Sequence, residues 1–212
     1  MTSGKRTPLC LLILLALALA GPARASLKVG PPSIGTGILR FHDADLRSLY
    51  DRLPQLVFIL RGHGLSQISP TLAVACSWAS HRDPDGFLAA SETQVLFLPV
   101  MLQIPWEQHL NGTWMIRVGP QFTWAGLREE WNATVSEAQI DATGHSTASW
   151  LAAGVMGELW ARLGGAGSVG LAADWNWTSA DRATARGNRE RETPMEGGWS
   201  GLRLCWTPFG RP

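Results

Sequence analysis

The amino-acid sequence predicts an all-β protein, an eight-stranded antiparallel up-and-down transmembrane β-barrel. Three observations predict it: eight strand-like segments, connections that are alternately short and long, and tryptophans near both ends of the segments. Alternation with a period of two gives a strand two unlike faces. Short turns at one rim and longer loops at the other are typical of a membrane barrel. The sequence therefore indicates a closed sheet with one face toward lipid.

Eight segments are expected to be strands, and several of them alternate clearly. The alternation is clearest along residues 113–125, where Trp114 and Phe122 share one face with the aliphatic residues between them. Pro120 lies on the same face, and because proline donates no backbone hydrogen bond, a bulge or local distortion is expected there. No stretch after Ala25 is a convincing amphipathic helix. The expected strands are residues 33–41, 53–61, 70–79, 93–106, 113–125, 148–162, 168–178 and 198–208.

The first 25 residues have the pattern of a secretory signal peptide. Lys5 and Arg6 precede a run of twelve apolar residues, and small residues flank a cleavage site after Ala25. Twelve apolar residues are too few to cross a bilayer as a helix, which needs roughly 20. The expected organisation is a signal peptide over residues 1–25 and a single barrel domain over residues 26–212.

The connections between the expected strands differ in length and composition. Short turns are expected at residues 62–66, 107–112 and 164–167. The long, polar joins are residues 42–52, 80–92, 126–147 and 179–197. We expect the four long joins to be external loops.

The tryptophans fall into two bands, as expected for side chains that settle at the two membrane–water boundaries. The alternative is that tryptophans at strand ends cap a soluble core. Trp150 and Trp199 also belong to the long-loop band. The tryptophans assigned to the membrane interface are Trp106, Trp114, Trp160 and Trp206 at the short-turn rim, with Trp78, Trp124, Trp175 and Trp177 toward the long-loop rim.

The face opposite the apolar stripe carries small residues, interrupted by Gln121 and a few charges, and Arg40 could join it from a less regular segment. It is too small and too poor in charge for a soluble surface, and Lys28 is the one lysine after the expected cleavage site. Side chains fill the interior of an eight-stranded barrel, and charges there need partners. We predict an ion-pair network in the lumen, drawn from Arg117, Glu158, Asp174 and Arg203.

The two cysteines of the exported part have opposite phases. Cys76 has the outward phase on the third expected strand, and Cys205 has the inward phase on the eighth. Those strands are not neighbours in an up-and-down barrel, so no disulfide is expected between them.

This architecture resembles the bacterial small outer-membrane β-barrel protein families, over about residues 28–209. The signal peptide, the eight alternating segments, the alternating loops and the closing strand GGWSGLRLCWTPF carry the resemblance. It implies a porin-like barrel in the outer membrane of the cell envelope of a Gram-negative bacterium, with the lipid bilayer as its partner. One departure is that Phe209, where such proteins often end, is followed by Gly210, Arg211 and Pro212.

Composition and motifs exclude several functions. A net charge of +1 does not favour nucleic acid, and neither a zinc-type Cys/His spacing nor a phosphate loop occurs, so no metal or cofactor is expected. His81 with Ser77 or Ser80 and Asp83 comes nearest to a catalytic set, but the spacing matches no motif and no catalytic residue is assigned.

Three function classes follow. We favour a monomeric structural or interaction protein with a side-chain-filled lumen. The alternatives are a soluble, lipocalin-like carrier of an apolar ligand with its apolar face inside and, with less support, a lipid-modifying enzyme. Lipopolysaccharide is a candidate partner, because arginine binds phosphate bidentately, although a solvated mixed-charge loop is favoured for the arginines concerned. They are Arg182, Arg186, Arg189 and Arg191.

Overall fold

The structure is a computed structural model that describes residues 28–63, 67–83, 90–135, 140–178 and 197–208. The expected signal peptide lies outside these residues. The strands run, in chain order, as β1 (Lys28–Val29), β2 (Ser33–Phe41), β3 (Leu53–His63), β4 (Thr71–Asp83), β5 (Ala90–Gln103), β6 (Trp106–His109), β7 (Trp114–Val135), β8 (Ile140–Arg162), β9 (Ser168–Thr178) and β10 (Trp199–Thr207).

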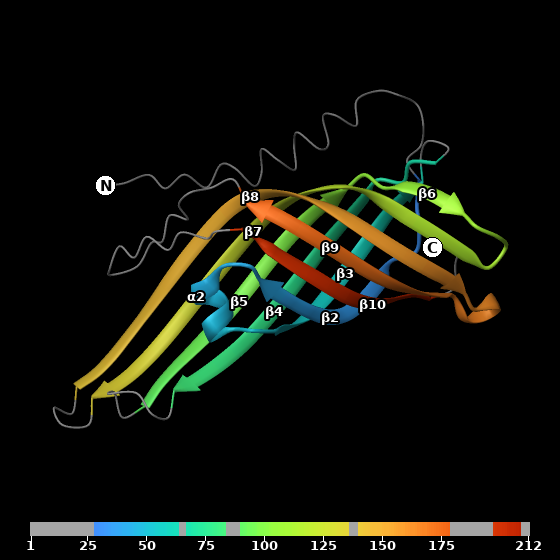
Figure 1. The fold of residues 1–212 in the computed structure, drawn as a ribbon. Helices are drawn as coiled ribbons and strands as arrows, with labels where there is room; N and C mark the ends of the chain where they lie inside the picture. Colours follow the sequence, from blue (N-terminus) through green and yellow to red (C-terminus); the bar gives the residue numbers. More distant parts are fainter. Residues whose placement is uncertain (1–27, 64–66, 84–89, 136–139, 179–196, 209–212) are drawn as a thin grey trace.

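Eight of these strands close into an antiparallel barrel (Figure 1). From β2 to β10, each long strand pairs with the next along the chain, and β10 pairs back with β2. The two short strands are accessory, since β1 pairs with β3 and β6 pairs with β7. A closed barrel leaves no unpaired edge around its circumference, which is what a sheet in lipid requires. The predicted fold class is confirmed.

Two of the expected long loops are largely strand. Strands β7 and β8 contain 22 and 23 residues, and they pair from Gly126 with Ser149 out to Val135 with Ile140. Likewise β4 and β5 remain paired as far as Asp83 with Ser91. The prediction of loops over 80–92 and 126–147 is therefore wrong for most of their length. Polar residues replace the apolar stripe there, so the lipid-facing pattern ends while the backbone ladder continues.

These longer strands give the barrel two different ends. We call the end at which β2 passes to β3 the long-loop end, and the opposite one the short-turn end. Figure 1 shows β4, β5, β7 and β8 projecting beyond the other four strands at the long-loop end. This four-stranded extension is a feature that the sequence analysis did not predict.

A short helix, α2 (Ala44–Leu49), occupies the join between β2 and β3. The backbone N–H of Leu46 donates to Asp43 Oδ1 at 2.9 Å, an N-terminal cap. Leu46 and Tyr50 are buried in the apolar cluster inside this end of the barrel. The expectation of no helix is wrong, because six residues are too few to show a helical period. Within the described residues no helix is both long and apolar enough to span a bilayer.

Removing this cap should loosen α2. We expect Asp43→Ala to cost about 1 kcal/mol of local stability, because the Leu46 N–H loses its acceptor. Hydrogen exchange of the Leu46 amide measures the effect, with the exposed Asp51→Ala as the control. Unchanged exchange at Leu46 in Asp43→Ala would contradict the capping role.

The backbone ladder is interrupted opposite Pro120. Ile104 donates to the Pro120 carbonyl at 3.1 Å, but Pro120 has no N–H to return the bond. Pro105 follows, and strand pairing resumes at Trp106 with Val118. The register is the same on both sides of the gap, so the distortion is an interruption rather than a bulge with an inserted residue.

Candidate functional site

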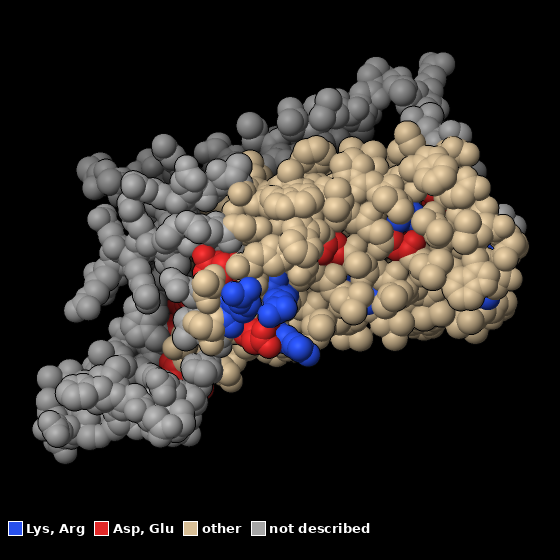
Figure 2. Space-filling model, in the orientation of Figure 1, with Lys and Arg blue, Asp and Glu red and all other residues tan. Residues whose placement is uncertain are grey.

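The two faces of the barrel wall differ sharply in chemistry. Along β7, Trp114, Val118 and Phe122 are exposed, whereas Arg117 and Gln121 are fully buried in the lumen. The same alternation holds on the other strands, whose outward positions carry exposed Leu, Ile, Val, Phe and Trp. Figure 2 shows the outer surface around the middle of the barrel as mostly uncharged. Because the apolar face is outside, the structure contradicts the lipocalin-like alternative.

Most of the predicted interface tryptophans lie on the outer face. Trp106, Trp114 and Trp206 are exposed at the short-turn end, and Trp124 is half-buried with the outward phase. An indole at such a position presents an apolar ring and an N–H donor to a membrane boundary. Exposed tryptophans toward the long-loop end are Trp78, Trp175 and Trp177.

Three tryptophans lie inside the barrel instead. The interface position predicted for Trp160 is wrong, since its side chain is fully buried in the lumen, and Trp150 and Trp199 are buried at the long-loop end. Trp160 lies two residues after Glu158, and positions two apart on a strand share a face. The lumen position predicted for Glu158 therefore already implied that Trp160 points inward. Gly170 on β9 makes room for it, because a Cβ there would meet the indole at 2.4–2.8 Å.

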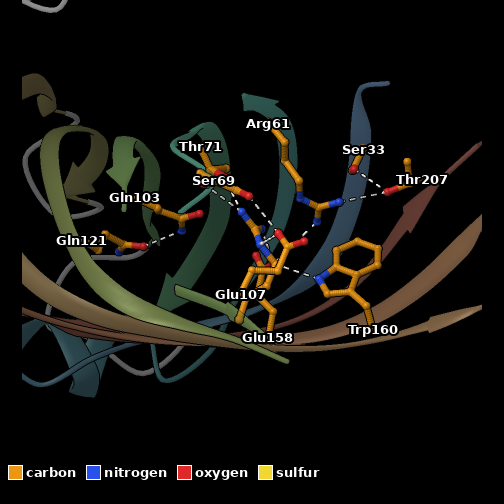
Figure 3. A network of polar contacts seen from close by, with 11 residues as sticks. Ser33, Arg61, Ser69, Thr71, Gln103, Glu107, Gln121, Glu158, Trp160 and Thr207 are labelled. Carbon is orange, nitrogen blue, oxygen red and sulfur yellow. Dashed lines mark hydrogen bonds and ion pairs between the residues drawn. The ribbon is translucent and has the colours of Figure 1, made fainter. Parts of the chain in front are cut away.

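The lumen near the short-turn end contains a polar network centred on Glu158 (Figure 3). Its carboxylate accepts hydrogen bonds from Arg117 at 2.6 Å and from Trp160 Nε1 at 2.8 Å. The Arg61 guanidinium lies 3.6 Å from the same oxygen and 4.0 Å from the centre of the Trp160 ring. Two buried cations thus share one carboxylate, and the indole ring stacks against one of them.

Each arginine of this network has further partners. Arg117 donates to the Ser69 carbonyl at 3.1 Å and to Thr71 Oγ1 at 2.7 Å, and its Nε lies 3.5 Å from Glu107. Arg61 donates to Thr207 Oγ1 at 3.3 Å, where β10 meets β2. The network therefore ties the strands to one another across the lumen as well as around the wall.

A second network lies closer to the middle of the lumen. Arg203 pairs with Asp174, and Asn176 donates to the same carboxylate at 2.7 Å. Gln121 donates to Asn176 Oδ1 at 2.7 Å, and Gln103 donates to Gln121 at 2.6 Å. The structure thus places all four predicted lumen residues inside the barrel, as the pairs Arg117–Glu158 and Arg203–Asp174.

Several residues of these networks were missed by the sequence analysis. Arg61 belongs to a segment that is apolar in both phases, which hid its direction. Glu107 was assigned to a turn but lies on β6. Gln121 was predicted inside, yet its amide partner Gln103 was not identified. Arg40, a weaker lumen candidate, points outward and is exposed.

Apolar and aromatic side chains fill the lumen at the long-loop end. Phe97 has its ring centre 5.2 Å from Phe41, 5.2 Å from Trp199 and 5.9 Å from Trp150. Leu46 of α2 belongs to the same buried cluster. Dispersion and burial hold such a cluster closed, so both halves of the lumen are occupied by side chains.

Most of the remaining site candidates lie outside the described residues. The four arginines of the last long join lie outside the described residues, as do the side chains of His81 and Asp83. Ser77 points into the lumen and is fully buried. No metal-binding group of His, Cys, Asp and Glu occurs among the residues that the structure describes. Cys76 and Cys205 are free thiols, the first half-buried and the second buried.

Comparison with known proteins yields structures only. No protein-family model matches the sequence, and no curated protein matches it. The attachment invasion locus protein Ail of Yersinia pestis matches with a TM-score of 0.49 and 9% identity, over 85% of this chain and 98% of that chain. The same values hold for Ail in complex with the heparin analogue sucrose octasulfate.

A third solved structure, Neisserial surface protein A, has a TM-score of 0.39 and 4% identity over 85% of this chain and 96% of that one. Similarities at this level carry no argument about what the present chain binds. The strand pairing, the outward apolar face and the filled lumen define the molecule directly. The chain is an eight-stranded antiparallel β-barrel with the architecture of the small outer-membrane barrels that its sequence resembles.

Proposed function

We propose that this chain is an outer-membrane β-barrel protein of the structural or interaction type, with a lumen that does not conduct. The observation that carries the proposal is the contrast between the two faces of the wall. An apolar outer surface surrounds an interior of paired charges and packed rings. Such a surface is favourable in lipid and unfavourable in water. The barrel lies in the outer membrane with the bilayer as its partner.

The filled lumen argues against transport. Arg61, Arg117 and Arg203 are balanced inside by Glu107, Glu158 and Asp174, so these groups leave no net charge to attract an ion. Opening a path would separate buried ion pairs, which costs several kcal/mol for each charge that stays buried without its partner. The aromatic cluster below α2 closes the long-loop end as well.

The extension at the long-loop end offers a surface for interaction. We call the band of outward apolar side chains around the barrel the apolar belt. The outer side of the extension holds a groove of about 600 Å³ on β4, β5 and β7, with Trp78 and Leu96 near the apolar belt and polar groups beyond them. Arg128 pairs with Glu130 there, and Gln94 donates to Glu92 at 3.3 Å. A polar sheet held above an apolar belt is suited to contacts outside the membrane.

Membrane fractionation and conductance test this proposal together. The protein should sediment with outer membranes, migrate differently on gels before and after boiling, and give no steady current in a planar bilayer. A fully soluble periplasmic protein would contradict the membrane assignment. A sustained ohmic current from the purified monomer would contradict the closed lumen instead.

A further inference from the structure

A compact group of exposed charges lies on the outer surface at the long-loop end. It consists of Arg40 on β2, Arg47 on α2, and Asp51 and Arg52 just before β3, and we call it the arginine patch. Figure 2 shows charged side chains gathered over α2 and the end of β2, beside the uncharged surface. We propose that the arginine patch binds a phosphate group on the headgroup of an outer-leaflet lipid. This inference rests on the proposed membrane location.

The acidic residue of the patch orients two of the arginines. Asp51 Oδ1 lies 3.5 Å from Arg40 Nε, and Asp51 Oδ2 lies 3.5 Å from Arg52 Nε. The side chains of Arg40 and Arg52 remain 57% and 71% exposed. Both guanidinium groups are thus held by their inner nitrogen. Their terminal amino groups have no partner among the described residues and remain available to a ligand.

The backbone places the two arginines side by side. Leu39 pairs with Leu53, so Arg40 on β2 and Arg52 just before β3 occupy adjoining, exposed positions. Their guanidinium groups can then approach one tetrahedral anion from two sides. Guanidinium binds phosphate through paired N–H groups, which a single ammonium cannot do.

The position of the patch selects a lipid headgroup over a free anion. The next outward residue on β2 toward the barrel middle is Ile38, and on β3 it is Pro54, so the patch borders the apolar belt. On the other side of β2, Arg40 pairs with Ser200 of β10, and Ser200 pairs with Trp175 of β9. Trp175 is one of the exposed tryptophans assigned to the membrane interface. Cations at this level meet headgroups rather than acyl chains or bulk water.

The patch also carries an excess of positive charge. Arg40 and Arg52 share one carboxylate, that of Asp51, and Arg47 is an exposed cation on α2. By contrast, the exposed Arg128 on the extension is paired one-to-one with Glu130. The arginine patch therefore keeps cationic groups free for an anionic ligand, whereas the Arg128–Glu130 pair does not. Arg128 serves as a matched control for this reason.

Native mass spectrometry of the detergent-solubilised full chain tests the proposal, with bisphosphorylated lipid A as the probe. We expect the wild-type chain to retain one lipid A, and the double variant Arg40→Ala/Arg52→Ala to bind it about 30-fold more weakly. Arg128→Ala should bind as the wild type does. Lipid A with both phosphates removed should bind the wild type as weakly as lipid A binds the double variant.

Equal binding of lipid A by the wild type and the double variant would overturn the proposal, provided that the variant keeps its gel shift on boiling. Equal binding of phosphorylated and dephosphorylated lipid A would also overturn it, as would inorganic phosphate that binds the patch as tightly as lipid A does. An error in the proposed membrane location would be detected separately, because membrane fractionation tests it without added lipid A.

Discussion

Replacing Glu158 by alanine is expected to lower the free energy of unfolding by about 3–5 kcal/mol, the cost of leaving buried charge without its partner. Glu158 is the carboxylate that Arg117, Arg61 and Trp160 share. Without it, the fully buried Arg117 keeps only the 3.5 Å contact with Glu107 as a charged partner. Guanidinium chloride unfolding of the barrel in phospholipid vesicles, followed by tryptophan fluorescence, measures the change.

The control for this variant is an ion pair outside the barrel body. Glu130→Ala removes the carboxylate that pairs with Arg128 on the extension, where both side chains are at least half exposed. Exposed pairs contribute about 0–1 kcal/mol, so this variant should unfold almost as the wild type does. If Glu158→Ala were no more destabilising than Glu130→Ala, the lumen network would not be holding the barrel together.

Replacing Phe122 by arginine should cost about 2 kcal/mol, the lower end of the range for a cation at the middle of the lipid face of a barrel, because Trp124 at the membrane boundary is two residues away. Phe122 is 54% exposed on β7, between Leu102 of β5 and Ala153 of β8. In water such an exposed position would accept arginine with almost no effect. The same unfolding measurement in vesicles reports the difference.

Leu110 provides the matched control for Phe122. It is 55% exposed and lies between β6 and β7 at the short-turn end, outside the belt. Leu110→Arg should therefore change stability by less than about 0.5 kcal/mol. Equal effects of the two substitutions would show that Phe122 does not face lipid.

The phases of the strands could be predicted from sequence because the two faces meet different media. Along β7, alternation alone placed Phe122 outside and Arg117 and Gln121 inside. The bounds of β2 and β9 were also predicted, because both strands end at the edge of the apolar belt or within a few residues of it. Beyond the belt the alternation disappears, and the extension of β7 and β8 was read as loop.

Other features depend on strand pairing and packing, which the alternation of apolar and polar residues does not specify. Arg61 could not be placed, because its strand is apolar in both phases and only the pairing of β3 with β4 fixes its direction. Helix α2 is too short to show a period, and its burial depends on a cluster built from distant strands. Trp160 could have been placed from sequence, because it is two residues from Glu158 and must share its inward face. The preference of tryptophan for membrane boundaries led to the wrong prediction.

The most direct test of a lipid-facing barrel is a nitroxide scan of residues 114–125 in vesicles, with Cys10, Cys76 and Cys205 replaced by serine. Collisions with oxygen, which concentrates in lipid, should be frequent at positions 116, 118 and 122 and rare at 117, 121 and 123, with a period of two. In the structure Val118 and Phe122 are exposed and Ile116 is half-buried with the outward phase, whereas Arg117, Gln121 and Thr123 are buried. The opposite phase, or frequent collisions with a water-soluble nickel chelate at 118 and 122, would contradict a lipid-facing outer surface.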